Sequence, residues 1–537
     1  MDQVLSKIAQ LNEIGIALSA ATDVDVLCDK ILTGAMELTG SDGGSLYKMS
    51  DDKTSLEFVI VTTHSLDIHM GGHSGHKIRF PAIPLMVNGQ PNKSNVVSSA
   101  VHDEHTINIP DAYHAEGFDF SGTRKFDQQT GYRTQSILTI PLTNHHNEII
   151  GVLQLINARD EATGETREFS KSDQQLAESL ASQAAVAITN NKLIEEQREL
   201  FEAFIKLMAS AIDEKSPYTG GHCKRVPELT MMIADACHQS QSEALKEFRM
   251  TEKDRYELTI AGWLHDCGKV TTPEYVVDKA TKLETIYDRI HTLEARFEVL
   301  RRDAEIEYLQ GCLRATDAAQ SVAELEQKYQ QTCQQLAVDF EFLRNANIGG
   351  EFMSEADIAR VHQLAQVHWT DTNGVQRSLL SDDEAMNLSI ERGTLNDTER
   401  EVINNHIVAT IKMLESLPFP KNLQNVPEYA GGHHEKMDGT GYPKGLKRDE
   451  MSVQARIMAI ADIFEALTAS DRPYKKGKKL SECLKIMEFM KQENHIDPDI
   501  FDIFIRQRVY QDYADEFLDP QQIDKIEEAQ TPRFSIR

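Results

Sequence analysis

Two stretches of the chain, Leu264-His265-Asp266-Cys267-Gly268-Lys269 and His433-His434-Glu435-Lys436-Met437-Asp438-Gly439-Thr440-Gly441-Tyr442-Pro443, decide its interpretation. Imidazole nitrogens and carboxylate oxygens suit divalent transition metals, and one carboxylate can bridge two ions. A single His-Asp pair is most often a surface turn of a helix. Here a Gly-Lys, a double His and a Gly-rich turn accompany the pair, so the two stretches predict a site for two metal ions.

Three residues elsewhere extend this set. His222 opens a helix after a Gly-Gly pair, His406 follows the stretch 393–399, and Asp462 stands in the apolar run 459–467. A lone buried carboxylate needs a cation or a hydrogen-bond partner. Taken alone, Asp462 is equally well read as an acid on a helix surface. In the company of the histidines, we interpret it as a metal ligand.

These motifs resemble those of the HD-GYP family, a branch of the HD phosphohydrolases, over residues 214–296 and 393–510. The family's HDxGK motif corresponds to residues 265–269, and its HHExxDGxGYP motif corresponds to 433–443 without a gap. A late run follows, with Asp462, then Ala466-Leu467-Thr468, then Arg472-Pro473-Tyr474. The resemblance implies an all-helical, metal-dependent cyclic di-GMP phosphodiesterase that yields pGpG and, by a further step, GMP.

The resemblance also implies roles for individual residues. One ion is assigned to His222, His265, Asp266 and Asp462. Asp266 bridges to a second ion, which is assigned to His406, His433 and His434. Asp266 and Lys269 are the expected catalytic residues, with Lys269 on a substrate phosphate. The expected substrate-binding residues are Lys269, Gly439, Gly441, Tyr442, Pro443 and Arg472, with the two glycines letting the backbone approach a nucleotide.

The number and kind of ions follow from the ligand types. Some family members carry a Glu four residues before the first ligand His, where it helps to hold a third ion. This chain has Tyr218 there, and a tyrosine with a pKa near 10 is a poor ligand at neutral pH. The resemblance, which allows two or three ions, therefore points to two divalent ions here, and mixed imidazole and carboxylate ligands favour iron or manganese over structural zinc.

Two histidines compete for the ligand position after HDxGK. The family pattern has a Leu eleven residues and a Glu seven residues before this His. Leu395 and Glu399 satisfy it for His406, whereas Leu283 lies only eight residues before His291. We therefore predict His406 as the ligand, and residues 297–392 as a helical insertion that folds aside.

The composition limits the function. The chain has 537 residues and a net charge of −29, which argues against binding a nucleic-acid polymer. Its seven cysteines have no CxxC spacing, no apolar run approaches a membrane span, and no secretory signal is evident. These features predict a cytoplasmic protein that needs a locally basic place for a phosphate ligand. Lys436, Lys444, Lys447 and Arg448 either serve this purpose or form a solvated face.

Residues 1–170 predict an α+β domain, with two helices before residue 40 and a hairpin of strands around 136–142 and 149–156. The stretches 130–138 and 151–157 resemble a GAF domain of the cyclic-nucleotide-binding type. Asn157, Phe169 and Asp173 match its ligand signature, while Ala158 and Gln174 replace Lys and Glu. The resemblance implies a sensor for a cyclic nucleotide or another small ligand.

A group of four histidines in this domain is open to two interpretations. His64, His69, His73 and His76 lie in a loop-like stretch. They either bind a metal or are solvated loop residues. The second interpretation is favoured, because no Cys or carboxylate pattern in the sequence completes a site.

Residues 171–213 predict one long helix without Pro or Gly. Its apolar stripe favours a parallel homodimer, with docking on its own domain as the alternative. The expected fold is multidomain: a GAF sensor (1–170), this helix, and an all-α HD-GYP domain (214–296 and 393–537) interrupted by the insertion. The expected function is GAF-regulated hydrolysis of cyclic di-GMP. Alternatives are hydrolysis of another cyclic dinucleotide and a non-catalytic scaffold.

Overall fold

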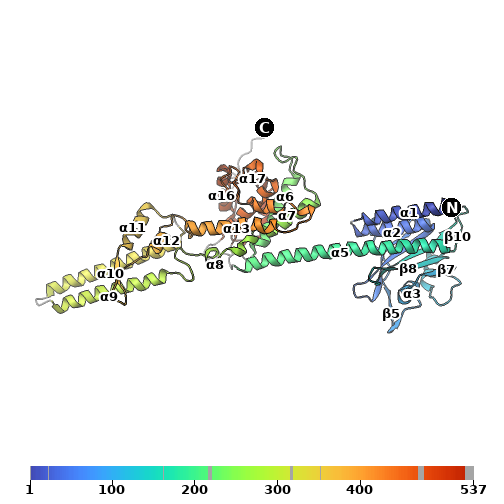
Figure 1. Cartoon of the computed structure of the whole chain (residues 1–537), viewed down its shortest axis with the longest axis horizontal. Coiled ribbons are helices and arrows are strands. Elements are labelled where there is room, and N and C mark those ends of the chain that lie inside the picture. The colour runs from blue at the N-terminus through green and yellow to red at the C-terminus, as the bar shows by residue number, and fades with distance from the viewer. Residues whose placement is uncertain are drawn as a thin grey trace. The chain divides into compact units, whose positions relative to one another are not determined.

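This computed structural model describes residues 2–21, 23–160, 162–215, 221–314, 319–350, 352–469 and 477–526. Tyr218 and Arg472 lie outside these ranges. The chain forms two compact units, residues 1–201 and 202–537. The predicted multidomain arrangement, an α+β unit followed by a mainly helical one, is confirmed (Figure 1).

The first unit is built on an antiparallel sheet. Its strands run in the order β3-β2-β1-β9-β8-β7, with β10 beside β9 and β4 beside β2. The strands are β1 (Ser41–Met49), β2 (Ser55–Thr63), β3 (Ile68–Gly71), β4 (Ile83–Pro84), β7 (Ile107–Ile109), β8 (Ile137–Thr143), β9 (Ile149–Arg159) and β10 (Thr166–Arg167). The predicted hairpin is confirmed, because β8 and β9 pair antiparallel with Leu138 opposite Leu155.

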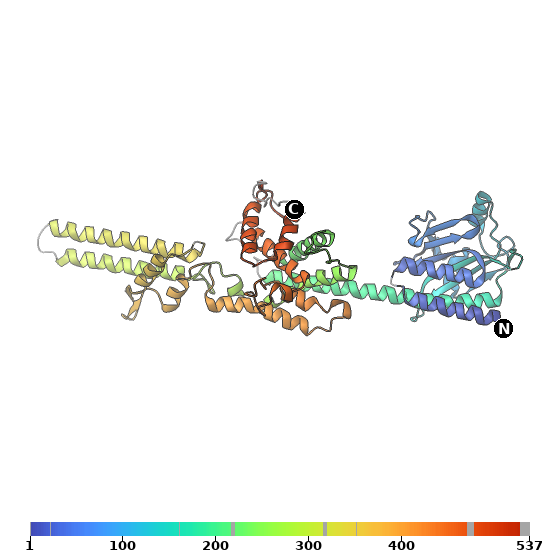
Figure 2. The same cartoon turned by 90° about the horizontal axis from the view of Figure 1, so that it is seen from above.

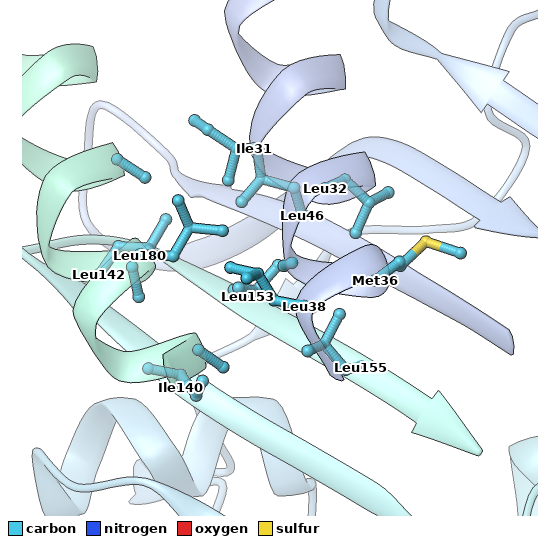
Figure 3. Close-up of a cluster of buried hydrophobic side chains, with 14 of the residues drawn as sticks. Ile31, Leu32, Met36, Leu38, Leu46, Ile140, Leu142, Leu153, Leu155 and Leu180 are labelled. Atoms are coloured by element: carbon cyan, nitrogen blue, oxygen red, sulfur yellow. The ribbon is translucent and has the colours of Figure 1, made fainter. Parts of the chain in front are cut away.

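Helices α1 (Asp2–Ser19), α2 (Val24–Thr39) and the start of α5 share one apolar core with the sheet. Alternate residues of β8 and β9, such as Ile140 and Leu153, point into this core and meet α2 and α5, as Figure 3 shows. Burying such side chains stabilises the fold by about 1.5–3 kcal/mol each. On the other face, α3 (Val96–Asp103) and α4 (Ser121–Thr130) line a cavity together with sheet residues. Strands β5 (Met86–Val87) and β6 (Gln90–Pro91) form a small hairpin of their own.

The predicted long helix is α5 (Lys171–Lys215), which has 45 residues. Its first part contributes Ala177, Leu180 and Ala184 to the core of the first unit. Further along, large apolar side chains are exposed: Leu193, Ile194, Leu200, Phe204 and Leu207.

In the described part of the second unit, the regular elements are helices apart from a short hairpin of β11 (His368–Thr370) and β12 (Gln376–Ser378). The two histidine-rich motifs are surrounded by these helices: α6 (His222–Gln239), α7 (Glu252–Leu264), η3 (Cys267–Thr271), α8 (Glu274–Val277), α13 (Asp397–Glu415), α14 (Val426–Gly431), α15 (Val453–Thr468), α16 (Leu480–Gln492), α17 (Pro498–Arg506) and α18 (Val509–Phe517). Helix α6 packs on α7 and α15, and α13 packs on η3 and α14.

Between α8 and α13 the chain forms a separate cluster. Helices α9 (Ile290–Arg314) and α10 (Ala319–Ile348) lie side by side in Figures 1 and 2, followed by α11 (Glu355–Ala365) and α12 (Asp382–Leu388). Their shared apolar cluster includes residues from Leu283 to Leu388. The segment is thus helical as expected, with α9 and α10 packed as a hairpin, while the bounds 297–392 stay a prediction.

An ion pair between Lys279 and Glu399 joins the two chain segments that flank helices α9 to α12. The Lys279 ammonium lies 2.7 Å from each carboxylate oxygen of Glu399 and 3.1 Å from Asn387 Oδ1. Lys279 precedes the segment and Glu399 follows it, so their ion pair brings the flanking chain together.

None of the helices in the described ranges combines the length and the apolar character that a membrane span requires.

Candidate metal centre

The residues predicted as ligands come from five places in the second unit. His222 begins α6, His265 and Asp266 lie between α7 and η3, and His406 lies in α13. His433 and His434 follow α14, and Asp462 lies in α15. The structure brings these seven side chains together, most of them buried.

Asp266 stands between two groups of side chains. On one side, its Oδ2 atom lies 3.2 Å from His222 Nε2 and 3.3 Å from His265 Nε2. On the other side, its Oδ1 atom lies 3.2 Å from His406 Nε2. The two oxygens of a single carboxylate therefore face different imidazole groups, which is the geometry of a bridging ligand.

Each group has three or more donors. Asp462 Oδ1 lies 3.3 Å from His222 Nε2 and completes the first group. In the second group, His434 Nε2 lies 3.2 Å from His406 Nε2, and His433 lies alongside. Donor atoms about 2.0–2.2 Å from one ion lie roughly 3.0–3.4 Å from one another, and the observed separations have this size.

The histidine rings are oriented by hydrogen bonds on the far side. The Nδ1–H groups of His265 and His433 donate to the carbonyl oxygens of Gly262 (2.8 Å) and Ala430 (2.6 Å). His406 makes the equivalent bond to the carbonyl of Ile403. A carbonyl can only accept, so the hydrogen is on Nδ1 and the Nε2 lone pair faces the cluster. This second-layer support is typical of metal-binding histidines.

Three buried atoms of the cluster have no hydrogen-bond partner among the described residues: His265 Nε2, Asp266 Oδ1 and His433 Nε2. Unsatisfied buried polar atoms are costly. All three atoms carry a lone pair. A metal ion can therefore take the place of the missing hydrogen-bond donor at each of them. The residues present therefore fit a centre for two divalent ions.

The electrostatics of the cluster agree with this interpretation. Burial raises the pKa of Asp266, but the charge of Lys269 and the neighbouring histidines hold it well below its usual range. Burial lowers the pKa of His433 well below its ordinary value and lowers that of His434 to about 4. At neutral pH the second group thus offers neutral imidazoles, the protonation state that metal ions require. In the first group, burial lowers the pKa of His222 and His265, but neighbouring carboxylates raise it, well above the ordinary value for His222 and to about 9 for His265. A metal ion bound there would take the place of those protons.

Lys269 follows Asp266 by one turn, and its ammonium contacts Asp266 Oδ2. Burial lowers the pKa of Lys269, but Asp266 and Asp462 raise it, to about 12. Its side chain is 24% exposed, so this cation is charged and can be reached from solvent. It is suitably placed for a phosphate oxygen.

The residues of the second motif form a turn beside His434. The ring of Tyr442 stacks on the His434 imidazole, with centroids 4.9 Å apart. Tyr442 and Pro443 also line a hollow of about 430 Å³ together with residues of α13: Asp397, Arg400, Glu401, Asn404, Asn405 and Val408. A surface hollow thus adjoins the second group of ligands.

The glycines of this turn serve the chain itself. A Cβ atom on Gly441 would lie 2.3 Å from the backbone nitrogen of Lys436 and 2.5 Å from Glu435 Cα. Gly441 therefore makes a close approach to the protein's own backbone, and the expected approach of this turn to a nucleotide stays a prediction. Gly439 has a φ of +83°, a conformation that glycine adopts without strain.

Sequence reasoning missed two acidic residues. Glu465 is 1% exposed, accepts the Nδ1–H of His222 and pairs with Arg225. Glu435, also 1% exposed, accepts the backbone N–H groups of Lys444 and Leu446 and fixes the turn. The signal for Glu465 was present, since it follows Asp462 by three residues in the same apolar helix.

The structure also shows the surroundings of one basic residue of the turn and of the histidine that was not chosen as a ligand. Arg448, interpreted as part of a basic turn, pairs with Asp497 and Asp499. His291 lies on α9 with a side chain 74% exposed, near Glu294, whereas His406 lies in the cluster.

The three residues predicted to bind a ligand in the first unit make contacts within the domain's own fold. Asn157 accepts from the backbone of Gln135 and donates to the carbonyl of Arg133. Phe169 belongs to the apolar core, and Asp173 pairs with Arg167 and Ser170 at the start of α5. A cavity of about 270 Å³ on the other face of the sheet is lined by different residues, including Tyr47, Phe58, Phe126 and Gln154.

Family models match both units. The model described as HD domain matches residues 381–500, a span with His406, His433, His434 and Asp462, and the model described as GAF domain matches residues 23–188. The chain contains a GAF domain and an HD domain. The match to a GAF and HD arrangement confirms the resemblance seen in the sequence.

Curated relatives match parts of the chain. It is 36% identical over 149 residues to 3'3'-cGAMP-specific phosphodiesterase 3 of Vibrio cholerae, covering 28% of this chain and 29% of that protein. It is 37% identical over 114 residues to cyclic di-GMP phosphodiesterase PA4108 of Pseudomonas aeruginosa (21% and 26%). It is 30% identical over 154 residues to a cyclic di-GMP phosphodiesterase of Thermotoga maritima (29% and 39%). The matches thus span less than half of each relative.

Among solved structures, the GAF domain of a phosphoenolpyruvate-protein phosphotransferase from Coxiella burnetii matches at 14% identity with a TM-score of 0.28. It covers 36% of this chain and 98% of that chain. The GAF domain/HD domain protein from Geobacter sulfurreducens matches at 18% identity with a TM-score of 0.24, covering 33% and 98%.

Proposed function

We propose that the HD domain is a metal-dependent phosphodiesterase that hydrolyses a cyclic dinucleotide. The observation that carries this proposal is the position of Asp266, whose two oxygens face separate groups of imidazoles, each with Nε2 directed inward. Support comes from the relatives named as cyclic di-GMP and 3'3'-cGAMP phosphodiesterases.

In this proposal, His222, His265 and Asp462 hold one ion, His406, His433 and His434 hold the other, and Asp266 bridges them. When bound, two such ions supply an activated water and positive charge for the phosphoryl oxygens. Iron or manganese suits these ligands best. Lys269 contributes a compact positive charge to a non-bridging phosphate oxygen.

The preferred substrate in this proposal is cyclic di-GMP, with pGpG as the first product and GMP as the second. Tyr442 and Pro443 border the hollow beside the second ligand group, and Asn404 and Asn405 in its wall are suited to hydrogen bonds with a base edge. Hydrolysis of another cyclic dinucleotide, such as 3'3'-cGAMP, is the second candidate, because the Vibrio relative carries that name.

The test combines metal and product analysis. Protein purified without oxygen is analysed for iron and manganese, then incubated separately with cyclic di-GMP, 3'3'-cGAMP and cyclic di-AMP. Asp266→Ala should lose metal and hydrolysis together, because it removes the ligand shared by both groups. Turnover in this variant equal to that of the wild type would exclude a two-metal mechanism, and a non-catalytic scaffold would turn over none of the three.

We further propose that the protein is a homodimer through α5. Val186, Leu193, Leu200 and Leu207 are exposed and recur every seven residues, and Phe204 lies four residues after Leu200. Exposed apolar residues at this spacing suit a parallel coiled coil with a second copy. Leu200→Glu/Phe204→Glu should convert a dimer into a monomer in light scattering; a wild type that is monomeric would exclude this dimer.

Regulation by a small ligand in the GAF domain is part of the proposal. The cavity of about 270 Å³ has aromatic walls and a polar group in Gln154, a mixture typical of small-molecule sites. Removing residues 1–170 should change the hydrolysis rate. An unchanged rate and oligomeric state would contradict this role.

A further inference from the structure

The GAF domain has a second cluster of metal-type side chains, distant in sequence from the HD motifs. It joins Asp29 of α2 with His69 of β3 and His73 of η2 (Gly72–Ser74). One donor atom from each residue lies within 4.8 Å of the others. The sequence offered only the histidines, and the fold supplies the carboxylate that completes the set.

Asp29 is the centre of this cluster. The residue is 7% exposed. Its Oδ2 atom accepts the backbone N–H of His73 at 3.0 Å and contacts the His73 Nδ1 atom. Its Oδ1 atom is buried and has no hydrogen-bond partner among the described residues. A buried carboxylate oxygen without a partner is costly unless a cation satisfies it.

His69 is oriented toward that oxygen. Its Nδ1 atom lies 2.9 Å from the Thr62 hydroxyl, and its Nε2 atom lies 3.5 Å from Asp29 Oδ1. A partner on one ring nitrogen that leaves the other facing a carboxylate is the usual arrangement of a metal-binding histidine. Two ligands of a tetrahedral zinc ion lie roughly 3.3 Å apart, given metal–ligand distances of about 2.0–2.1 Å, and the observed separation is close to this.

The backbone between the two histidines is shaped around the carboxylate. Gly72 has a φ of +51°, and a Cβ atom on it would lie 2.7 Å from both oxygens of Asp29. Only glycine therefore lets this segment fold so closely over Asp29. The outer side of the cluster is open, because the side chains of His69 and His73 are 41% and 66% exposed.

We infer that Asp29, His69 and His73 bind one divalent transition-metal ion of the zinc class, with water or a small ligand at the open positions. Two imidazoles and one carboxylate form the donor set that zinc, cobalt and ferrous iron accept. The ion ties β3 and η2 to α2, which shares its apolar core with α5. Metal occupancy is thereby linked to the element that leads out of the GAF domain.

The test counts metal ions on the full chain. Metal-free wild type and the double variant His69→Ala/His73→Ala are equilibrated with Co²⁺, and bound cobalt and its visible absorption are measured. The double variant should bind one equivalent less than the wild type. His64→Ala/His105→Ala, which removes two exposed histidines of the same domain, should bind as much as the wild type.

A second pair of variants separates this site from the HD domain. His406→Ala/His434→Ala should lose cobalt from the HD domain and retain the equivalent bound by the GAF domain, so failure of the proposed function and failure of this site give different results. Asp29→Asn should lose the equivalent of cobalt bound by the GAF domain. Its far-ultraviolet circular dichroism should match that of the wild type, because the fold is retained. Equal cobalt content in the wild type and His69→Ala/His73→Ala would overturn the inference, and Asp29 with His73 would then be an ion pair alone.

Discussion

Gly268 allows the HDxGK segment to lie directly against α13, so Gly268→Ala is the most informative single change. A Cβ atom at this position would lie 1.9 Å from the carbonyl oxygen of His406 and 2.5 Å from the backbone nitrogen of Thr410. The backbone N–H of Gly268 also donates to the Thr410 hydroxyl at 2.8 Å. The φ of Gly268 is not positive, so alanine is excluded by space and not by backbone conformation.

The size of the effect follows from these distances. Cβ atoms essentially never lie closer than 3.0 Å to another heavy atom, so η3 and α13 must separate by about 1.1 Å (3.0 − 1.9). That displacement moves His406 away from Asp266. In the wild-type structure, His406 Nε2 lies 3.2 Å from Asp266 Oδ1. Overpacking of this kind costs about 1–3 kcal/mol of stability. Misplacing reacting groups by about 1 Å costs roughly 100-fold in rate.

The assay measures metal content, thermal unfolding and hydrolysis of cyclic di-GMP in parallel. Gly268→Ala should lower metal occupancy, lower the unfolding temperature by several degrees, and reduce turnover by roughly two orders of magnitude. Gly350→Ala is the matched control, because its Cβ would meet only one atom, at 3.8 Å. If Gly268→Ala matched the control in all three measurements, the contact between η3 and α13 would not position the metal ligands.

Three further predictions concern single residues. His406→Ala should lower metal content and abolish hydrolysis while the exposed His291→Ala is mild; the reverse pattern in metal analysis would place the ligand on the other side of the insertion. Glu465→Gln should weaken metal binding by about 10- to 100-fold, because it disturbs the hydrogen bond that orients His222; unchanged metal affinity in a competition titration would contradict this. Asp497→Asn should destabilise the HD domain by about 3–5 kcal/mol at neutral pH, because it leaves the largely buried Arg456 without its carboxylate partner, while Arg448 keeps Asp499. Burial raises the pKa of Asp497 but the two arginines hold it below its usual value, so the wild-type advantage exists above a pH of about 4 and should disappear in denaturant unfolding as the pH falls through the lower, folded pKa; an advantage that persists in strong acid would refute this cause.

The local sequence was sufficient for the elements and for the chemistry of the HD site. Alternation in residues 136–142 and 149–156 predicted β8 and β9, and the long run without Pro or Gly predicted α5. The ligand types in the HDxGK and HHExxDGxGYP motifs predicted metal chemistry, because donor atoms are a property of the side chains. The choice of His406 over His291 came from the spacing that the resemblance to the HD-GYP family implies.

Other features depend on contacts between distant segments. The Gly441 contact with its own turn, the Asp497 partner of Arg448, and the hydrogen bond of Glu465 to His222 were not readable from spacing. The same holds for Asn157, whose side chain bonds to the chain 22 and 24 residues earlier.

The sequence by itself determined which residues can act as ligands and which segments form helices or strands, because periodicity and donor chemistry are local. Tertiary structure alone decided which atoms meet. It set the two oxygens of Asp266 toward different imidazole groups, and it brought Asp29 to His73, 44 residues away. The physical reason is that a metal centre requires lone pairs converging within a few ångströms, and only packing of distant elements fixes their directions.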